Sequence, residues 1–190
     1  DTNWYFAAKN PGHWAENIKV AIIDNAADQI ITPTLESGTI AATKVGFGVT
    51  QALTGNTIGV GTVTAATGIL KGVITGKTAT TIDVKVVSTV IDGTETLVEY
   101  QQNSQFEFKT GTMLNIVNNS GSTVGKGSTI TSTDWYNSQN ILTSVADGGS
   151  DFATLSWRAV LNKPKTNNYV SRRDGTNDAL HIVVIDAGGG

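Results

Sequence analysis

Short β-rich segments separated by glycines fill the middle of the chain, and they limit its fold more than any other feature. Seven such segments lie between Thr43 and Asn118. In one of them Ile82, Val84 and Val86 alternate with polar residues, which gives a strand with one apolar face. Short strands joined by glycine turns predict a small barrel or sandwich. The repeated glycines predict bulges that bend the strands around a barrel.

The composition agrees with a mainly β protein. The chain has 190 residues, of which 21 are glycine, and only 15% are charged. An average globular domain has about 25% charged residues, and a chain rich in glycine, threonine and valine favours strands and tight turns. We therefore expect a mainly β fold with a few short helices and α+β character. The net charge of −3 gives no basic field for nucleic acid, and no apolar run reaches the length of a membrane helix.

Two strand-like segments flank this middle zone. Ile18–Ile23 opens with polar and apolar residues in alternation, and His181–Asp186 contains an unbroken apolar run typical of a central, buried strand. We expect the two strands to share one sheet. The domain prediction is a discontinuous domain of residues 1–42 plus 119–190, with an inserted small β-barrel at 43–118. Both ends of the sequence lie close to strands, and we expect the chain to be part of a longer protein.

Other segments have weaker patterns. The stretch after the first strand contains Pro33 and predicts a loop with one short strand or helical turn. Phe106 and Phe108 alternate with charged residues and predict a strand. The glycine- and serine-rich stretch Gly121–Thr129 predicts a flexible linker. Asp134 is a candidate helix N-cap, and residues 163–178 predict a long polar connection.

The sequence contains no motif for catalysis or metal binding. Its two histidines, His13 and His181, have no metal-ligand spacing to one another, and there is no cysteine. No G-x-S-x-G nucleophile motif is present, and Gly121–Thr129 departs from the phosphate-binding loop pattern. We therefore predict a protein that is not an enzyme and uses no cofactor or metal.

A basic cluster is the most conspicuous charge feature. It consists of five Lys and Arg residues within 16 positions, namely Arg158, Lys163, Lys165, Arg172 and Arg173. Such a cluster either docks an acidic neighbour or phosphate, or forms a solvated polar loop. The sequence leaves both alternatives open.

Two stretches resemble a known family. "AAKNPGHWAENIKVAI" resembles the A-x-x-P-G-x-W-G-N-x-L-x-V-x-I signature of tail sheath proteins of contractile-tailed bacteriophages, with Ala15 where a glycine is usual. "KPKTNNYVSRRDGTNDALHIVVIDAGG" resembles a second stretch of the same T4-like proteins, including those of marine phages. The signature residues that match are Pro11, Gly12, Trp14, Asn17, Pro164, Tyr169, Gly175, Asn177, Asp178 and His181.

The resemblance implies an architectural role in the virion. Sheath subunits polymerise helically around the inner tail tube, and the sheath contracts to drive that tube through the host envelope. The chain would then be an outer surface domain whose partners are other sheath subunits. The inner tube, the baseplate and the tail terminator would be contacted through other parts of the protein. Neither nucleic acid nor membrane is an implied partner, and synthesis would take place in the host bacterial cytoplasm.

A carbohydrate-binding or adhesin-type β module is the alternative. Aromatic residues could stack on sugars if they were exposed, although core packing is the more ordinary role for them. The residues concerned are Trp4, Tyr5, Trp14, Trp135 and Tyr136. Screening on a glycan array separates this alternative from the sheath hypothesis.

Overall fold

The computed structural model describes residues 9–10, 12–13, 17–53, 57–58, 61–62, 68–142, 154–173, 175 and 178–186. The fold is mainly β, with 49% strand and 11% helix, which confirms the predicted fold class. The strands are β1 (Ile18–Asp24), β2 (Gln29–Gly38), β3 (Gly48–Ala52), β4 (Thr57–Ile58), β5 (Gly61–Thr62), β6 (Gly68–Lys77), β7 (Ile82–Ile91), β8 (Thr94–Leu97), β9 (Met113–Val117), β10 (Thr123–Asp134) and β11 (Leu180–Asp186). The short helices are η2 (Ile40–Ala42), η3 (Tyr136–Ser138), α2 (Trp157–Val160) and α3 (Asn168–Ser171).

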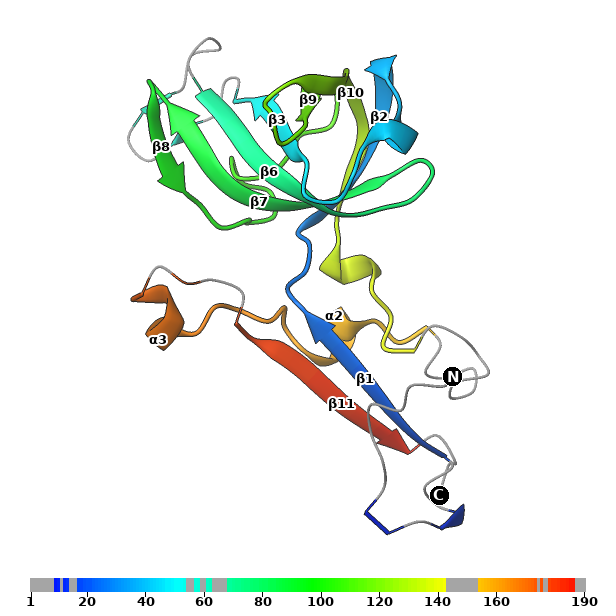
Figure 1. The fold of residues 1–190 in the computed structure, drawn as a ribbon. Helices are drawn as coiled ribbons and strands as arrows, with labels where there is room; N and C mark the ends of the chain where they lie inside the picture. Colours follow the sequence, from blue (N-terminus) through cyan, green and yellow to red (C-terminus); the bar gives the residue numbers. More distant parts are fainter. Residues whose placement is uncertain are drawn as a thin grey trace. The chain divides into compact units, whose positions relative to one another are not determined.

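Six strands form a closed antiparallel barrel (Figure 1). Their order is β2-β10-β9-β3-β6-β7, and the barrel closes where β7 pairs with β2 from Gln29↔Val84 to Ile31↔Ile82. Strand β8 extends the sheet beyond β7, and β4 and β5 form a separate two-stranded sheet. The prediction of a small barrel is therefore confirmed.

The inside of the barrel is packed with aliphatic side chains from every wall. Ile82, Val84 and Val86 of β7 are all buried, as their alternation predicted. Glycines lie at the register shifts of β6, between Lys71 and Gly72 and between Ile74 and Gly76. At Gly72 an added Cβ would lie 2.7 Å from Val84 Cγ1. The glycine therefore serves both the bulge and the close approach of the neighbouring strand.

Strand β2 corrects the prediction of a loop around Pro33. Pro33 is buried within a ten-residue strand that pairs with β10 along its length. The pairing with β7 ends at Ile31, so β2 has only one neighbouring strand at Pro33. A proline, which cannot donate to a second ladder, is tolerated at such a position.

Strand β10 corrects the prediction of a flexible linker at Gly121–Thr129. Thr123–Asp134 is a twelve-residue strand that pairs with both β2 and β9. Only Asn118–Ser122 forms a turn, in which Asn118 Oδ1 accepts from the backbone of Ser120 and Ser122 and Gly121 has φ +81°. The glycines within β10 lie where its register shifts, so they are residues of the strand and not of a linker. Asp134, predicted as a helix N-cap, is the last residue of this strand.

The chain divides into two compact units, and their boundaries differ from the predicted ones. The first unit comprises Asp1–Asn25 and Asn137–Gly190, and the second is Ala26–Tyr136. The inserted unit is thus longer than 43–118, because β2 and β10 are walls of the barrel. Its two ends lie side by side, since Gln29 pairs with Asp134 and Trp135 N–H donates to the Asp28 carbonyl at 2.9 Å. Adjacent ends allow a self-contained unit to be inserted within another.

The discontinuous unit is built on a two-stranded antiparallel sheet of β1 and β11. The register runs from Ile18↔Asp186 to Asp24↔Leu180, which confirms that the two flanking strands share one sheet. Ala21, Ile23 and Ile185 are buried, whereas Ile182 and Val184 are 54% and 63% exposed. The prediction of a centrally buried β11 is therefore wrong for one face, because β1 is its only partner strand within the described residues.

Candidate functional site

The C-terminal signature stretch folds into a compact loop that leads into β11. The Asp178 carboxylate accepts from Asn167 N–H at 2.8 Å, and Gly175 N–H donates to the Val170 carbonyl at 3.1 Å. A Cβ added at Gly175 would lie 2.5 Å from Val170 Cγ1, so this position has no room for a side chain. These signature residues hold the loop together.

The loop is also tied at its start. Pro164 is buried, and Nε2 of His181 lies 2.7 Å from the Asn162 carbonyl oxygen. The long polar connection predicted at 163–178 therefore contains defined structure, including helix α3, whose N-cap Asn167 accepts from Tyr169 N–H. Asn177 lies outside the described residues.

The N-terminal signature is described only in part. Pro11 and Trp14 lie outside the described residues, while Gly12 and Asn17 are exposed. Asn17 directly precedes β1, so the described end of this signature leads into one strand of the β1–β11 sheet. Each signature stretch thus adjoins one strand of the same sheet.

Tyr169 of α3 and Arg173, which follows the helix, form a paired surface feature. The Arg173 guanidinium lies 3.7 Å from the centre of the Tyr169 ring, and its Nη1 donates to the Tyr169 carbonyl at 3.1 Å. Tyr169 is 65% exposed. A guanidinium over an aromatic face is a cation–π contact, which fixes the orientation of this arginine at the surface.

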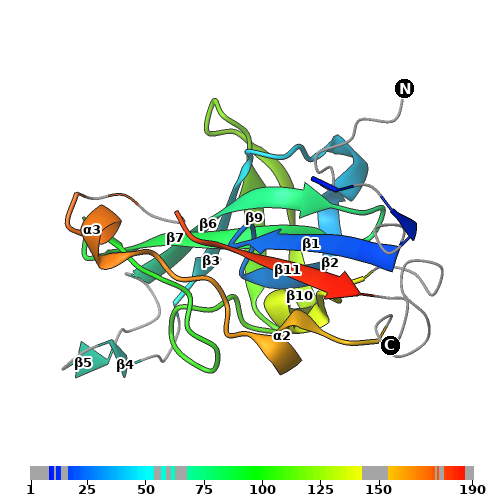
Figure 2. The same cartoon turned by 90° about the horizontal axis from the view of Figure 1, so that it is seen from below.

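The five residues of the basic cluster are spread over several elements. Arg158 lies on α2, and Arg172 and Arg173 directly follow α3. The two helices lie apart in both views of the fold (Figures 1 and 2). Lys163 and Lys165 come from the connection between them. Arg172 and Arg173 are adjacent in the sequence and both exposed, so among the described residues of this unit they form a compact cationic feature, the Arg172–Arg173 pair.

The aromatic residues that could stack on sugars are only partly described. Tyr136 is 1% exposed and Trp135 is half-buried. Core packing is therefore the role of Tyr136. Trp4, Tyr5 and Trp14 lie outside the described residues.

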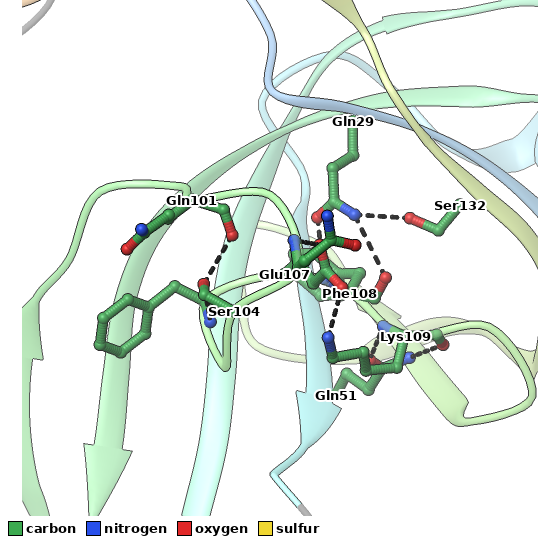
Figure 3. A network of polar contacts seen from close by, with 10 residues as sticks. Gln29, Gln51, Gln101, Ser104, Glu107, Phe108, Lys109 and Ser132 are labelled. Carbon is green, nitrogen blue, oxygen red and sulfur yellow. Dashed lines mark hydrogen bonds and ion pairs between the residues drawn. The ribbon is translucent and has the colours of Figure 1, made fainter. Parts of the chain in front are cut away.

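A buried polar network that the sequence did not predict crosses one mouth of the barrel (Figure 3). Gln29 of β2 accepts from Phe108 N–H at 2.8 Å and donates to the Phe108 carbonyl at 3.2 Å. Gln51 of β3 does the same for Lys109, at 2.6 Å and 3.1 Å. Each glutamine amide thus takes the place of a neighbouring strand, satisfying one donor and one acceptor of the backbone.

This network explains why the strand predicted around Phe106 and Phe108 is absent. Ser104–Glu107 is a run of bends, and after it the backbone of Phe108 and Lys109 pairs with two side chains instead of a strand. β2 and β3 stand three places apart in the six-stranded ring, so the segment crosses between opposite walls. Phe108 is 1% exposed and belongs to the barrel core. The signal for this network in the sequence is a glutamine at an inward-facing position in each of two strands.

Several ionisable side chains of the barrel unit make contacts that stabilise its structure. Lys85 Nζ lies 3.1 Å from Asp28 Oδ1, and the same carboxylate accepts from Val86 N–H at 2.9 Å. Burial, with a further contribution from the Asp134 carboxylate, raises the pKa of Tyr100. These contacts hold backbone and loop segments to the barrel end from which β2 starts.

Within the described part of the chain, no group of three or more His, Asp or Glu side chains could hold a metal ion. None of the described helices is long and apolar enough to cross a membrane. Comparison of the chain with protein-family models, curated proteins and solved structures finds no match. The fold therefore defines the protein as mainly β, with a closed barrel unit inserted in the sequence of a second unit.

Proposed function

We propose that this chain is an outer surface domain of a contractile bacteriophage tail sheath subunit. The observation that carries the proposal is the pairing of β1 with β11 over seven residues. Each of these strands adjoins one of the two stretches that resemble the sheath signature. A resemblance at two distant places in a sequence is more specific when the fold brings the two places together.

The roles of the signature residues also support the proposal. Gly175, Asp178 and His181 make contacts that shape a loop, and among the residues that the structure describes none of the three belongs to a group that could hold a metal. Residues of this kind fit an architectural domain. The adjacent ends of the barrel unit fit a module inserted into that domain.

Assembly tests the proposal directly. The complete polypeptide that contains this chain should form long hollow cylinders visible by negative-stain electron microscopy. Absence of such cylinders under conditions in which the protein is soluble and folded would reject the sheath role. Reproducible binding on a glycan array would favour the carbohydrate-binding alternative.

The Arg172–Arg173 pair is the part of the surface that we expect to dock a neighbouring subunit. The double change Arg172→Glu and Arg173→Glu should shorten or abolish the cylinders while leaving this chain folded, because both side chains are exposed. The matched control is Lys44→Glu with Lys126→Glu, which reverses two exposed charges on the barrel unit. Normal cylinders from the arginine variant would reject the docking role.

A further inference from the structure

One face of the β1–β11 sheet carries a row of exposed aliphatic side chains. Ile22, Leu180, Ile182 and Val184 are 50%, 52%, 54% and 63% exposed. The register places them on the same face, since Ile22 pairs with Ile182 and Val184 with the partly exposed Val20. Together they make one contiguous apolar row, and the largest apolar patch on a soluble protein, typically about 300–600 Å², is often a functional surface.

The ends of this face are acidic. Asp24 ends β1 and Asp186 ends β11, and both are exposed. Because the strands are antiparallel, the two carboxylates lie at diagonally opposite corners of the apolar row. Each strand thus presents three aliphatic residues followed by an aspartate on this face.

The dimensions of the face match one short helix. Two strands lie about 4.8 Å apart, and with their side chains they present a strip about as wide as a helix, whose diameter is about 10 Å. From Ile18 to Asp24 the strand advances about 20 Å, at about 3.3 Å per residue. A helix covers that length with about 13 residues, at about 1.5 Å per residue.

The charges and the size argue against a second copy of the same face. Stacking two copies would bring four carboxylates together, and the residues that face outward on β1 and β11 include no cation. The row of four aliphatic residues is also small beside the roughly 20–30 residues per side of a standard interface. The described helices α2 and α3 have four residues each, so the described part of a second copy has no helix long enough to cover the face.

We propose that this face docks a short amphipathic helix of another polypeptide, with an apolar stripe flanked at both ends by lysine or arginine. Aliphatic residues spaced at three and four positions would pack on the row of isoleucine, leucine and valine. The flanking cations would lie near Asp24 and Asp186 and fix the helix along the strands. This proposal does not rest on the sheath role, because it uses only the exposure, register and charge of β1 and β11.

The test uses the 190-residue chain and fluorescein-labelled synthetic peptides of 14 residues. The probe has a leucine stripe and two lysines at each end, and binding is followed by fluorescence anisotropy. One control peptide has glutamates in place of the lysines, and another has the same composition without the stripe. The unmodified chain should bind the probe at least about tenfold more tightly than either control.

Protein variants locate the binding. Ile182→Glu should weaken binding at least about tenfold, because it places a charge in the middle of the apolar row. Ile130→Glu is the matched control, since Ile130 of β10 is 50% exposed and belongs to the barrel unit, and it should leave binding unchanged. Thermal melting and amide NMR spectra of both variants establish that they are folded.

Three results would overturn the proposal. The first is failure of the unmodified chain to bind the probe at millimolar peptide. The second is equal binding by folded Ile182→Glu and the unmodified chain. The third is a concentration-dependent dimer in sedimentation velocity that Ile182→Glu abolishes, which would make a second copy the occupant.

Discussion

In the barrel, inward-facing aliphatic residues such as Ile31, Val84 and Ile116 have no measurable exposure, whereas Ile182 and Val184 of the β1–β11 sheet are more than half exposed. Both regions are built from β-branched residues in antiparallel strands. The barrel closes on itself, so each strand has neighbours and the inner face is shared by all of them. The two-stranded sheet of β1 and β11 has buried residues, such as Ile185, on one face only. The same residue types therefore form a fully buried core in one unit and an exposed surface in the other.

Phe108 offers the largest effect with which to test this comparison. Phe108→Ala should destabilise the barrel by about 3–5 kcal/mol, because it removes a buried aromatic side chain and leaves a cavity. Amide hydrogen exchange at Leu114 and Ile116 measures the loss, while protection at Val20 in β1 should be unchanged. Phe106→Ala, at a half-buried position, is the control. A loss below about 1 kcal/mol would mean that Phe108 does not complete the core.

The two glutamines come next. Gln29→Leu and Gln51→Leu should each destabilise the barrel by about 1–3 kcal/mol, because each removes the partner of a backbone N–H and C=O that are buried at Phe108 and part-buried at Lys109. Urea denaturation measures the effect, and Gln101→Leu, at an exposed position, serves as the control. If Gln29→Leu were as stable as the unmodified protein, the glutamine would not be replacing a strand.

The barrel itself and the pairing of β1 with β11 could be predicted from the sequence, because both depend on strong local signals. Ile82, Val84 and Val86 show a period of two, and of the two flanking strands the first opens with polar and apolar residues in alternation while the second contains an unbroken apolar run. Strand β10 could not be predicted, because its glycines and serines are also typical of linkers. Only the pairing with β2 and β9 shows that they are bulge positions.

The surface features depended even more on three-dimensional contacts. Counting charges in the sequence identified the basic residues. It could not show that they are divided between α2 and the end of α3. The exposed face of β11 was missed because a continuous apolar run predicts burial on both sides. Which side is covered depends on neighbouring elements, and those lie far away in the sequence.

The same small change at two isoleucines on opposite faces of β11 measures this difference between faces. Ile185→Val should destabilise the discontinuous unit by about 0.5–1.5 kcal/mol, because Ile185 is buried and a methylene is lost from the core. Ile182→Val should change stability by less than about 0.5 kcal/mol, because Ile182 is exposed. Tryptophan fluorescence during urea denaturation, with hydrogen exchange in β11, makes the measurement. Equal effects of the two changes would mean that the exposed face is covered in solution.

Two carboxylates on the outside of the barrel should give the smallest effects, and with opposite signs. Hydrogen bonds from Ser88 first and Lys71 second lower the pKa of Glu95 below its ordinary value of 4.5. Burial raises the pKa of Asp83 above its ordinary value of 3.8. The charged form is therefore favoured by folding at Glu95 and disfavoured at Asp83.

The pH dependence of two variants tests these signs. At neutral pH Glu95→Gln should lower the melting temperature slightly, and its difference from the unmodified protein should vanish as the pH falls through the lowered pKa of Glu95. Asp83→Asn should raise the melting temperature at neutral pH, because it removes a half-buried charge packed against Gly76. That gain should fade as the pH falls below the raised pKa of Asp83, where the unmodified carboxyl is neutral as well. Differential scanning calorimetry between pH 3 and pH 7 resolves both trends, and shifts of the same sign in the two variants would contradict the environments described for these side chains.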